Sequence, residues 1–174
     1  MAFLHLATLW WIISAISAQN LDPGKSLALR GRAAQSSTYS GYSNAINAID
    51  GNPDSNFNRG SCSCTQPDLS PWWRVDLLAS HKIFYVVITN RGDCCGERLD
   101  GAHILIGNSL ENNGNNNPRC AEISRIPNGA TQTFQCNGMV GRYVNIVLPK
   151  KQTYLQLCEV QVFGDPDSSS PLCY

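Results

Sequence analysis

The sequence predicts an all-β protein built as an antiparallel sandwich of short strands. Runs of β-branched and aromatic residues recur along the chain, often with every second residue apolar. Turn-rich connections separate these runs, including the Asn-dense segment 111–118, which we expect to be an exposed loop. No long stretch shows the apolar period of an amphipathic helix, and this combination is typical of a β-sandwich. The six strand candidates are residues 72–77, 82–89, 102–106, 131–136, 142–148 and 155–163.

The first 18 residues have the character of a secretory signal peptide. An apolar run begins at Phe3, ends in small residues at Ala18, and is shorter than the ~20 residues that a membrane span needs. We therefore expect a secreted, extracellular protein without membrane insertion. Residues 19–164 suffice for one domain, and residues 165–174 are predicted to be a flexible tail.

Charge and cysteine content narrow the function classes. The 13 basic and 13 acidic residues cancel, and the basic ones are scattered, so nucleic acid and acidic membranes are poor candidates for partners. Eight cysteines in an exported chain indicate disulfides, although about 105 pairings stay open. Zinc binding through Cys62 and Cys64 would lack a second matching pair.

The beginning of the domain is predicted to contain one short strand and one short helix. Residues 25–42 are polar and rich in Ser and Gly, as expected of an edge strand that runs into a loop. Apolar residues at helical spacing within 45–49 predict a helix of one or two turns, which Ser43 or Asn44 could cap and Gly51 could end.

That helix leads into a segment dense in side-chain oxygens. Calcium takes six to eight oxygen ligands, and such a segment can supply them. The same residue types also favour ordinary turns, because their side chains bond to the nearby backbone. Both interpretations stay open at this point for Asn47, Asp50, Asn52, Asp54, Asn56 and Ser61.

The most distinctive stretch is the loop that follows residue 89. Arg91 and Arg98 flank the adjacent Cys94 and Cys95, which a disulfide would join into a sharp turn with an apolar sulfur face. Both arginines can only donate hydrogen bonds, and Asp93 can hold one of them in place. A ligand with one apolar edge and several hydroxyl acceptors fits this arrangement, and a deoxy sugar is such a ligand.

Several motifs together resemble the fucose-binding F-type lectins, and in particular the eel fucolectins. The resemblance covers about residues 29–163 and implies a jelly-roll β-sandwich of the discoidin-like type, stapled by disulfides, with one bound structural calcium. The motifs that carry it are residues 50–52, 55–57, 71–77, 89–95, 97–99 and 157–163.

The resemblance also implies roles for residues in the sugar site. Arg91, Asp93 and Arg98 match the family motif, Cys94 and Cys95 match the disulfide on which fucose packs, and Phe57 would line the pocket for the sugar methyl. The family histidine falls on Cys64, a weaker donor, so one contact is lost or replaced by water at a cost of about 1–2 kcal/mol.

Disulfides and calcium ligands follow from the same resemblance. The implied bridges are Cys62–Cys158, Cys94–Cys95 and Cys120–Cys136, while Cys64 and Cys173 are left over and are expected to pair with each other or to link subunits. The implied calcium ligands are Asn47, Asp50, Asn52, Ser61, the backbone of Cys158, and Glu159.

The resulting prediction is a secreted lectin that recognises terminal α-L-fucose on blood-group or Lewis-type glycans and acts in innate defence by agglutination. The family also implies a homo-oligomer, a trimer. One alternative is a relative that has lost or altered sugar binding because Cys64 replaces the histidine. Another is an adhesion ligand that presents Arg91, Gly92 and Asp93 to a receptor, and no pattern of catalytic residues indicates an enzyme.

Overall fold

The computed structural model describes residues 24–168 of the chain. The predicted signal peptide, the domain start at residue 19 and Cys173 lie outside this range. Within residues 24–168, no helix has both the length and the apolar character needed to cross a membrane. The last strand continues through Pro166, where it pairs with His81, so the first two residues of the predicted flexible tail belong to the sheet.

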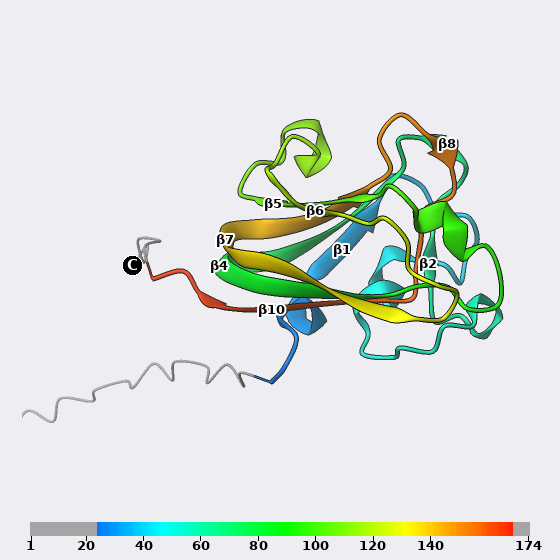
Figure 1. Ribbon diagram of the computed structural model, residues 1–174, viewed down its shortest axis with the longest axis horizontal. Helices are drawn as coiled ribbons and strands as arrows, with labels where there is room; N and C mark the ends of the chain where they lie inside the picture. The colour runs from blue at the N-terminus through cyan, green and yellow to red at the C-terminus, as the bar shows by residue number, and fades with distance from the viewer. Residues whose placement is uncertain (1–23, 169–174) are drawn as a thin grey trace, which may run out of the picture.

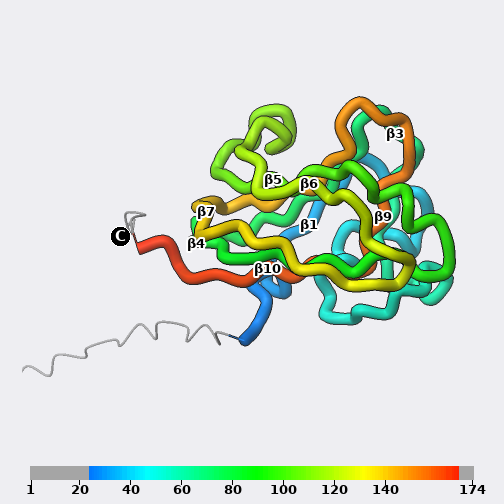
Figure 2. The backbone as a smooth tube through the Cα atoms, in the orientation of Figure 1, coloured from blue at the N-terminus to red at the C-terminus, as the bar shows by residue number. Residues whose placement is uncertain are grey.

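The described chain is a sandwich of antiparallel strands joined by loops and 3-10 turns (Figures 1 and 2). Its strands are β1 (Arg32–Gln35), β2 (Ser63–Cys64), β3 (Asp68–Leu69), β4 (Trp72–Thr89), β5 (His103–Gly107), β6 (Arg119–Glu122), β7 (Thr131–Val147), β8 (Gln152–Thr153), β9 (Gln156–Leu157) and β10 (Glu159–Pro166). Its 3-10 helices are η1 (Leu27–Arg30), η2 (Ala45–Ile49), η3 (Phe57–Arg59), η4 (Gly96–Leu99) and η5 (Glu111–Gly114).

The long strands β4 and β7 run through the whole sandwich. Residues 73–76 of β4 pair with β1 on one side, residues 72–76 pair with β7 on the other, and β5 and β6 continue the sheet beyond β7. Residues 81–89 of β4 pair instead with β10 and with the first half of β7. The ladder is interrupted between Asp76 and His81, where Leu78 has a positive φ of 70°, and β4 exchanges β1 for β10 at this bend while it stays paired with β7.

The core follows from the alternation along these strands. Trp73, Val75, Ile83, Val86 and Ile88 of β4 are almost completely buried, while most of the residues that alternate with them are more exposed. This is the period-2 pattern from which the strands were predicted. The indole nitrogen of Trp73 donates to the Ala45 carbonyl at 2.9 Å, which ties η2 to the sheet.

The predicted strands are present, but several of them begin and end at other residues than predicted. Candidates 72–77 and 82–89 form one strand, and so do 131–136 and 142–148, because bulges carry the ladder across their gaps. The short strand expected within 25–42 is β1, whose only partner in the described sheet is β4.

The predicted short helix near residue 45 needs a correction. Residues 24–168 contain no α-helix, and Ala45–Ile49 is a single 3-10 turn. Asn44 occupies its N-cap position without a side-chain capping bond, and Asp50, one residue before the predicted Gly51, ends it. Five residues pressed between β1 and β2 leave no length for a second α-helical turn.

Candidate functional site

The loops at one end of the sandwich enclose a pocket of about 260 Å³. It collects residues from the 3-10 helix η3, from the loop after β4, and from the small β2–β9 ladder, in which Cys64 lies opposite Gln156. The pocket is lined by Tyr39, Tyr42, Phe57, Asn58, Cys64, Arg91, Arg98, Tyr154 and Gln156.

Arg91 is held from two sides. Its Nε donates to Asp93 Oδ1 at 3.0 Å and its Nη2 to Oδ2 at 2.6 Å, while its guanidinium lies 4.3 Å from the centre of the Phe57 ring. Asp93 also accepts from the backbone nitrogen of Phe57 at 2.8 Å, so one carboxylate fixes both the cation and the ring. The bonds from Arg91 are the largest cause that lowers the pKa of Asp93, which therefore stays ionised well into acid.

Arg98 and Arg91 converge on one amide. With its side-chain oxygen turned toward the arginines, as the hydrogen-bond partners require, Gln156 accepts from Arg98 Nη1 at 2.7 Å and from Arg91 Nη1 at 3.2 Å. The Arg98 guanidinium also lies 4.6 Å from the Tyr154 ring centre. Two cations therefore share one buried neutral acceptor, and their remaining N–H groups are available to a ligand.

Cys64 lies beside this pair and is only 1% exposed. Burial raises the pKa of its thiol, and this outweighs the opposing effects of Gln156, Arg91 and Arg98, so the group is a neutral thiol at physiological pH. It forms no disulfide within residues 24–168, and the predicted partner Cys173 lies outside them. The Sγ atom donates weakly to the Thr65 carbonyl at 3.4 Å.

The Cys94–Cys95 disulfide forms as expected, and Cys95 has a positive φ of 60° directly before η4. Both residues are half-buried in the loop between the two arginines, but neither lines the pocket. The buried Asn90 fixes this loop by donating to the Gly96 carbonyl at 3.0 Å and to that of Ile126 at 2.7 Å. The disulfide therefore shapes the loop that carries Arg98.

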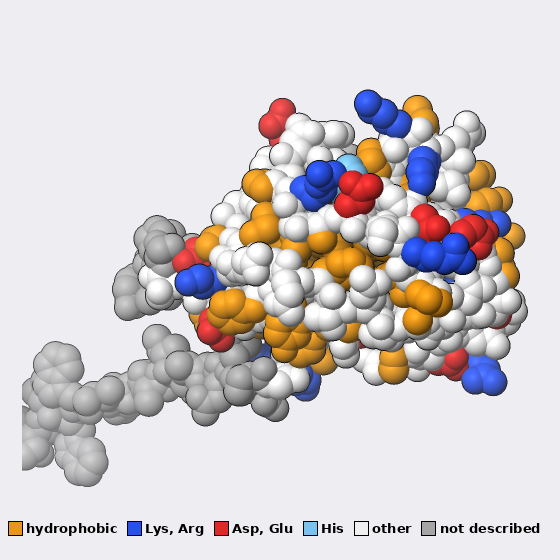
Figure 3. Space-filling model, in the orientation of Figure 1, with side chains coloured by type: hydrophobic (Ala, Val, Ile, Leu, Met, Phe, Trp, Pro, Cys, Tyr) orange, Lys and Arg blue, Asp and Glu red, His pale blue; other side chains and the backbone are white. Residues whose placement is uncertain are grey.

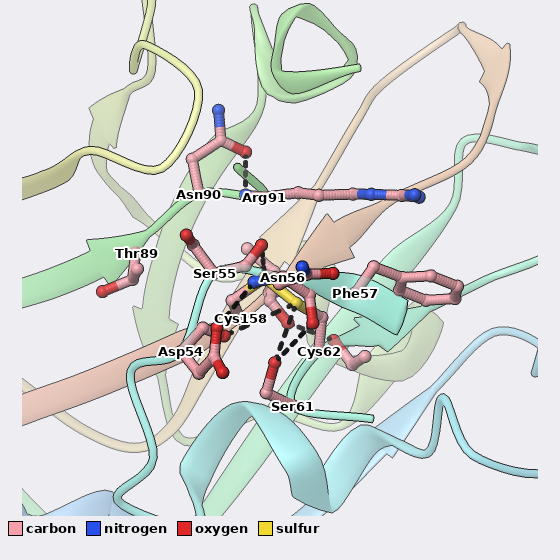
Figure 4. Close-up of a disulfide and its surroundings, with 12 residues drawn as sticks. Asp54, Ser55, Asn56, Phe57, Ser61, Cys62, Thr89, Asn90, Arg91 and Cys158 are labelled. Atoms are coloured by element: carbon pink, nitrogen blue, oxygen red, sulfur yellow. Dashed lines mark hydrogen bonds between the residues drawn. A yellow bond between two sulfur atoms is a disulfide. The ribbon is translucent and has the colours of Figure 1, made fainter. Parts of the chain in front are cut away.

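A second bridge, Cys62–Cys158, lies behind the pocket wall (Figure 4). It belongs to an apolar cluster with Phe57 and Cys64. The backbone carbonyl of Ser55 accepts from the Gly92 nitrogen at 2.8 Å, and Figure 4 shows the Arg91 and Phe57 side chains extending in the same direction. The remaining pair, Cys120–Cys136, staples β6 to β7 away from the pocket. These three bridges are the pairings that the family resemblance implied.

The segment from Asp50 to Asn58 is a ladder of Asx turns. The side-chain oxygen of every second residue accepts from the backbone nitrogen two residues further on, at 2.8 to 3.2 Å. The turn interpretation of this Asn- and Asp-rich stretch is therefore realised. It delivers Phe57 to the pocket with its backbone polar groups satisfied.

Glu159 nevertheless points to a cation beside the same segment. Its side chain is 2% exposed, and within the described chain its Oε2 atom has no hydrogen-bond partner. Burial, followed by the charge of Asp50, raises its pKa to about 8 despite a bond from the Gly51 nitrogen. Two carboxylates with an unsatisfied buried oxygen fit a hard cation that takes oxygen ligands.

The other expected calcium ligands already make hydrogen bonds within the protein. The Asn47 amide nitrogen donates to the carbonyls of Tyr42, Gly60 and Cys62, and Ser61 Oγ donates to the Asn56 carbonyl at 3.1 Å. Asn52 uses its side-chain oxygen in the Asx ladder. Within residues 24–168, no group of three or more His, Cys, Asp or Glu side chains is arranged so that it could hold a metal ion by itself. Amides and carbonyls would have to complete the shell.

Sequence reasoning missed five of the pocket residues. Gln156 and Tyr154 alternate with the core residues Leu155 and Leu157, so the alternation along the strand predicts that both point away from the core. It does not predict which residues they contact. Tyr39 and Tyr42 stack edgewise or tilted around Phe57 and Tyr154 from a loop that carries no motif. Asn58, the fifth, follows Phe57 in η3.

The chain is similar to known carbohydrate-binding proteins. The family of NedA-like, galactose-binding domains matches residues 47–146. Fucolectin-4 from Anguilla japonica is 57% identical over 143 residues, which make up 79% of each chain.

Two solved structures extend the comparison. The fucolectin from striped bass (Morone saxatilis) serum superimposes with a TM-score of 0.80 and 54% identity over 83% of this chain and 49% of that one, so this chain spans about half its length. A fucose binding module from Streptococcus pneumoniae has a TM-score of 0.68 and 30% identity over 80% of this chain and 95% of that one.

Proposed function

Because this chain belongs to the F-type lectin family of fucolectins, we propose that it binds terminal α-linked L-fucose on glycans, in the pocket that contains Arg91 and Arg98. The observation that carries the proposal is the convergence of both guanidiniums on Gln156 beside an aromatic wall. The named relatives are carbohydrate-binding lectins, and the chain is proposed to act by binding rather than by catalysis.

The recognition chemistry follows from the donor inventory. Arginine N–H groups donate to sugar hydroxyls and to the ring oxygen, which accept. Asp93 and Gln156 hold the guanidiniums before the sugar arrives, so little side-chain freedom is lost on binding. Phe57, whose ring packs under Arg91, supplies an apolar surface for the methyl group that distinguishes fucose. The Cys94–Cys95 sulfur atoms are proposed to meet the sugar ring from the loop.

The same contacts weigh against the adhesion alternative. The side chains of Arg91 and Asp93 are 12% and 16% exposed and bond to each other, so a receptor would have to separate them. A relative without sugar binding would have no use for two pre-held cations at one pocket. The thiol of Cys64 in place of the family imidazole is expected to weaken binding, not to abolish it.

We also propose that calcium is a structural cofactor. Glu159 and Asp50 would hold it with the Cys158 carbonyl, and Asn47, Asn52 and Ser61 would add neutral oxygens. A bound dication would neutralise the buried carboxylates and fasten the Asx ladder to β10.

The protein is further proposed to be secreted and to assemble as a trimer that agglutinates fucosylated surfaces in innate defence. Several modest sites on one assembly raise the strength of attachment without any new contact.

Calorimetric titration with L-fucose tests the central proposal. Saturable binding that is lost in Arg98→Ala and retained in Arg125→Ala, a matched arginine outside the pocket, would support it. Absence of heat with fucose and with fucosylated oligosaccharides, from a protein that still melts cooperatively, would reject it.

A further inference from the structure

A second pocket, of about 430 Å³, lies on the outer face of the six-stranded sheet, away from the arginine pair. Its floor is a row of residues that face one another across three strands: Trp72 of β4, Val147 of β7 and His103 of β5. Neighbours in sequence such as Trp73 and Ile146 point into the core, so this row points outward.

The floor of the pocket is sheltered from solvent, although it lies on the outer face of the sheet. Val147 is only 5% exposed although it lies outside the main core cluster, and Leu105 in the next row is equally buried. Two walls shelter them. One is the loop that contains η5, and the other is formed by Leu69, Ser70 and Pro149 beside the β3–β8 ladder. Figure 1 shows these two segments rising on either side of the sheet edge.

The η5 wall is fixed to the sheet. Arg74 Nη1 and Asn145 Nδ2 each donate to the Asn113 carbonyl at 2.7 Å. Asn112 and Asn113 both have positive φ values, 49° and 59°, which asparagine tolerates better than most residues. The loop predicted from sequence as merely exposed thus presents two amide side chains, Asn112 and Asn115, to the pocket in a set position.

The lining is aromatic and polar but nearly uncharged. The only titratable side chain in it is His103, which already contacts Arg119 and Glu122. Arg74 stacks 5.2 Å from the Trp72 ring centre and is committed to the loop. On the face in Figure 3, acidic and basic side chains lie mostly beside each other, so no strong field favours a charged ligand.

We propose that this pocket is a second saccharide site, for a neutral pyranose residue other than the one held by the arginines. The C–H face of the ring would pack on Trp72 and Leu105, and its hydroxyls would bond to the Asn112 and Asn115 amides and the Ser70 hydroxyl. The volume falls within the range of about 300–1,000 Å³ that is usual for small-molecule sites.

The two pockets lie along one pair of antiparallel segments. Cys64 and Gln156 belong to the first pocket, while Leu69 and Pro149 belong to the second. Leu69 lies five positions after Cys64, which corresponds to at most about 17 Å of extended chain. A single chain would then offer two sugar sites and bind a branched glycan divalently, without depending on its oligomeric state.

Nuclear magnetic resonance of the ¹⁵N-labelled protein tests this site through its two described indoles. D-galactose, N-acetyl-D-glucosamine and D-mannose are titrated in turn after the protein has been saturated with L-fucose. At least one of them is expected to shift the Trp72 indole N–H signal saturably at millimolar concentrations. The signal of Trp73, which is 1% exposed and bonded to Ala45, should stay in place as an internal control.

Variants separate this site from the first one. Asn115→Ala should weaken the Trp72 response about tenfold, as expected for one lost hydrogen bond, while Glu111→Ala, at an exposed residue of the same loop outside the lining, should leave it unchanged. Leu69→Ala, at a 72% exposed residue, is a second pocket variant should Asn115→Ala fold poorly. Arg91→Ala should lose fucose binding and keep the Trp72 response. The proposal is overturned if none of the three sugars moves the Trp72 signal. It is also overturned if the signal moves as much in Asn115→Ala and Leu69→Ala as in the unsubstituted protein.

Discussion

Replacing Gln156 with methionine tests whether the two arginines depend on their shared acceptor. The side chains are similar in length, and position 156 is 3% exposed, so packing should change little. The change removes the oxygen that accepts from Arg98 at 2.7 Å and from Arg91 at 3.2 Å. Hydrogen bonds to charged groups contribute about 1.5–3 kcal/mol, but both guanidiniums regain water from the pocket. We expect a net loss of about 1.5 kcal/mol in fucose binding, which is roughly tenfold in Kd.

Calorimetry and thermal unfolding of the same samples distinguish positioning from folding. Arg98 should be affected more than Arg91, because Asp93 still holds Arg91 through two bonds. Gln156→Glu, which keeps an acceptor, should restore part of the affinity, and Gln161→Met on β10, outside the pocket, should have no effect. Unchanged fucose affinity in a stable Gln156→Met protein would refute the reasoning.

Three further predictions address the remaining parts of the site. Cys64→His should tighten fucose binding about tenfold by adding a strong donor beside the arginines, and calorimetry showing equal or weaker binding in a folded variant would contradict this. Because the pKa of Asp93 is lowered, the stabilisation that its ionised form provides is present above its unfolded value of about 3.8 and is lost as pH falls through the lower folded value. Fucose affinity should thus be flat from pH 7 to about 4 and fall only in stronger acid, whereas Asp93→Asn should be weak at every pH. Chelation of calcium should lower Tm by several degrees in the parent protein, and Glu159→Gln should remove that dependence; equal melting curves with chelator and with calcium would exclude a structural ion.

Much of the fold was predictable because its strands show a regular alternation of apolar and polar residues over short stretches of sequence. The strand β4 alternates between core and surface from Trp72 onward, and this alternation is legible in any single sequence. The sequence did not show that its two halves form one strand, because at the bend β10 replaces β1 as the second neighbour of β4 while β7 stays paired with it. A positive φ at a leucine has no signature in the sequence.

The same distinction applies to the pocket. Arg91, Asp93 and Arg98 lie within eight residues, so their cooperation could be proposed from the chain alone. Gln156 comes from a segment far along the chain, and the β2–β9 ladder that brings it to Cys64 has only two residues in each strand. Ladders this short carry no periodic signal, which is why the second holder of the arginines appears only in three dimensions.

The choice of an amide at the junction of two cations has a consequence for recognition. Asp93 already neutralises Arg91, and a second carboxylate at position 156 would compete with sugar hydroxyls for the same N–H groups. A neutral carbonyl oxygen orients both guanidiniums without adding a second negative charge to the pocket, so each remaining N–H stays a strong donor toward a neutral ligand. For this reason Gln156→Glu is expected to restore only part of the affinity. The carboxylate would keep the arginines in position but would weaken their hydrogen bonds to the sugar by neutralising their charge. On the proposed mode of binding, the position beside the arginines can accordingly be a thiol, because the two cations, and not a third donor, would make most of the polar contacts with the sugar.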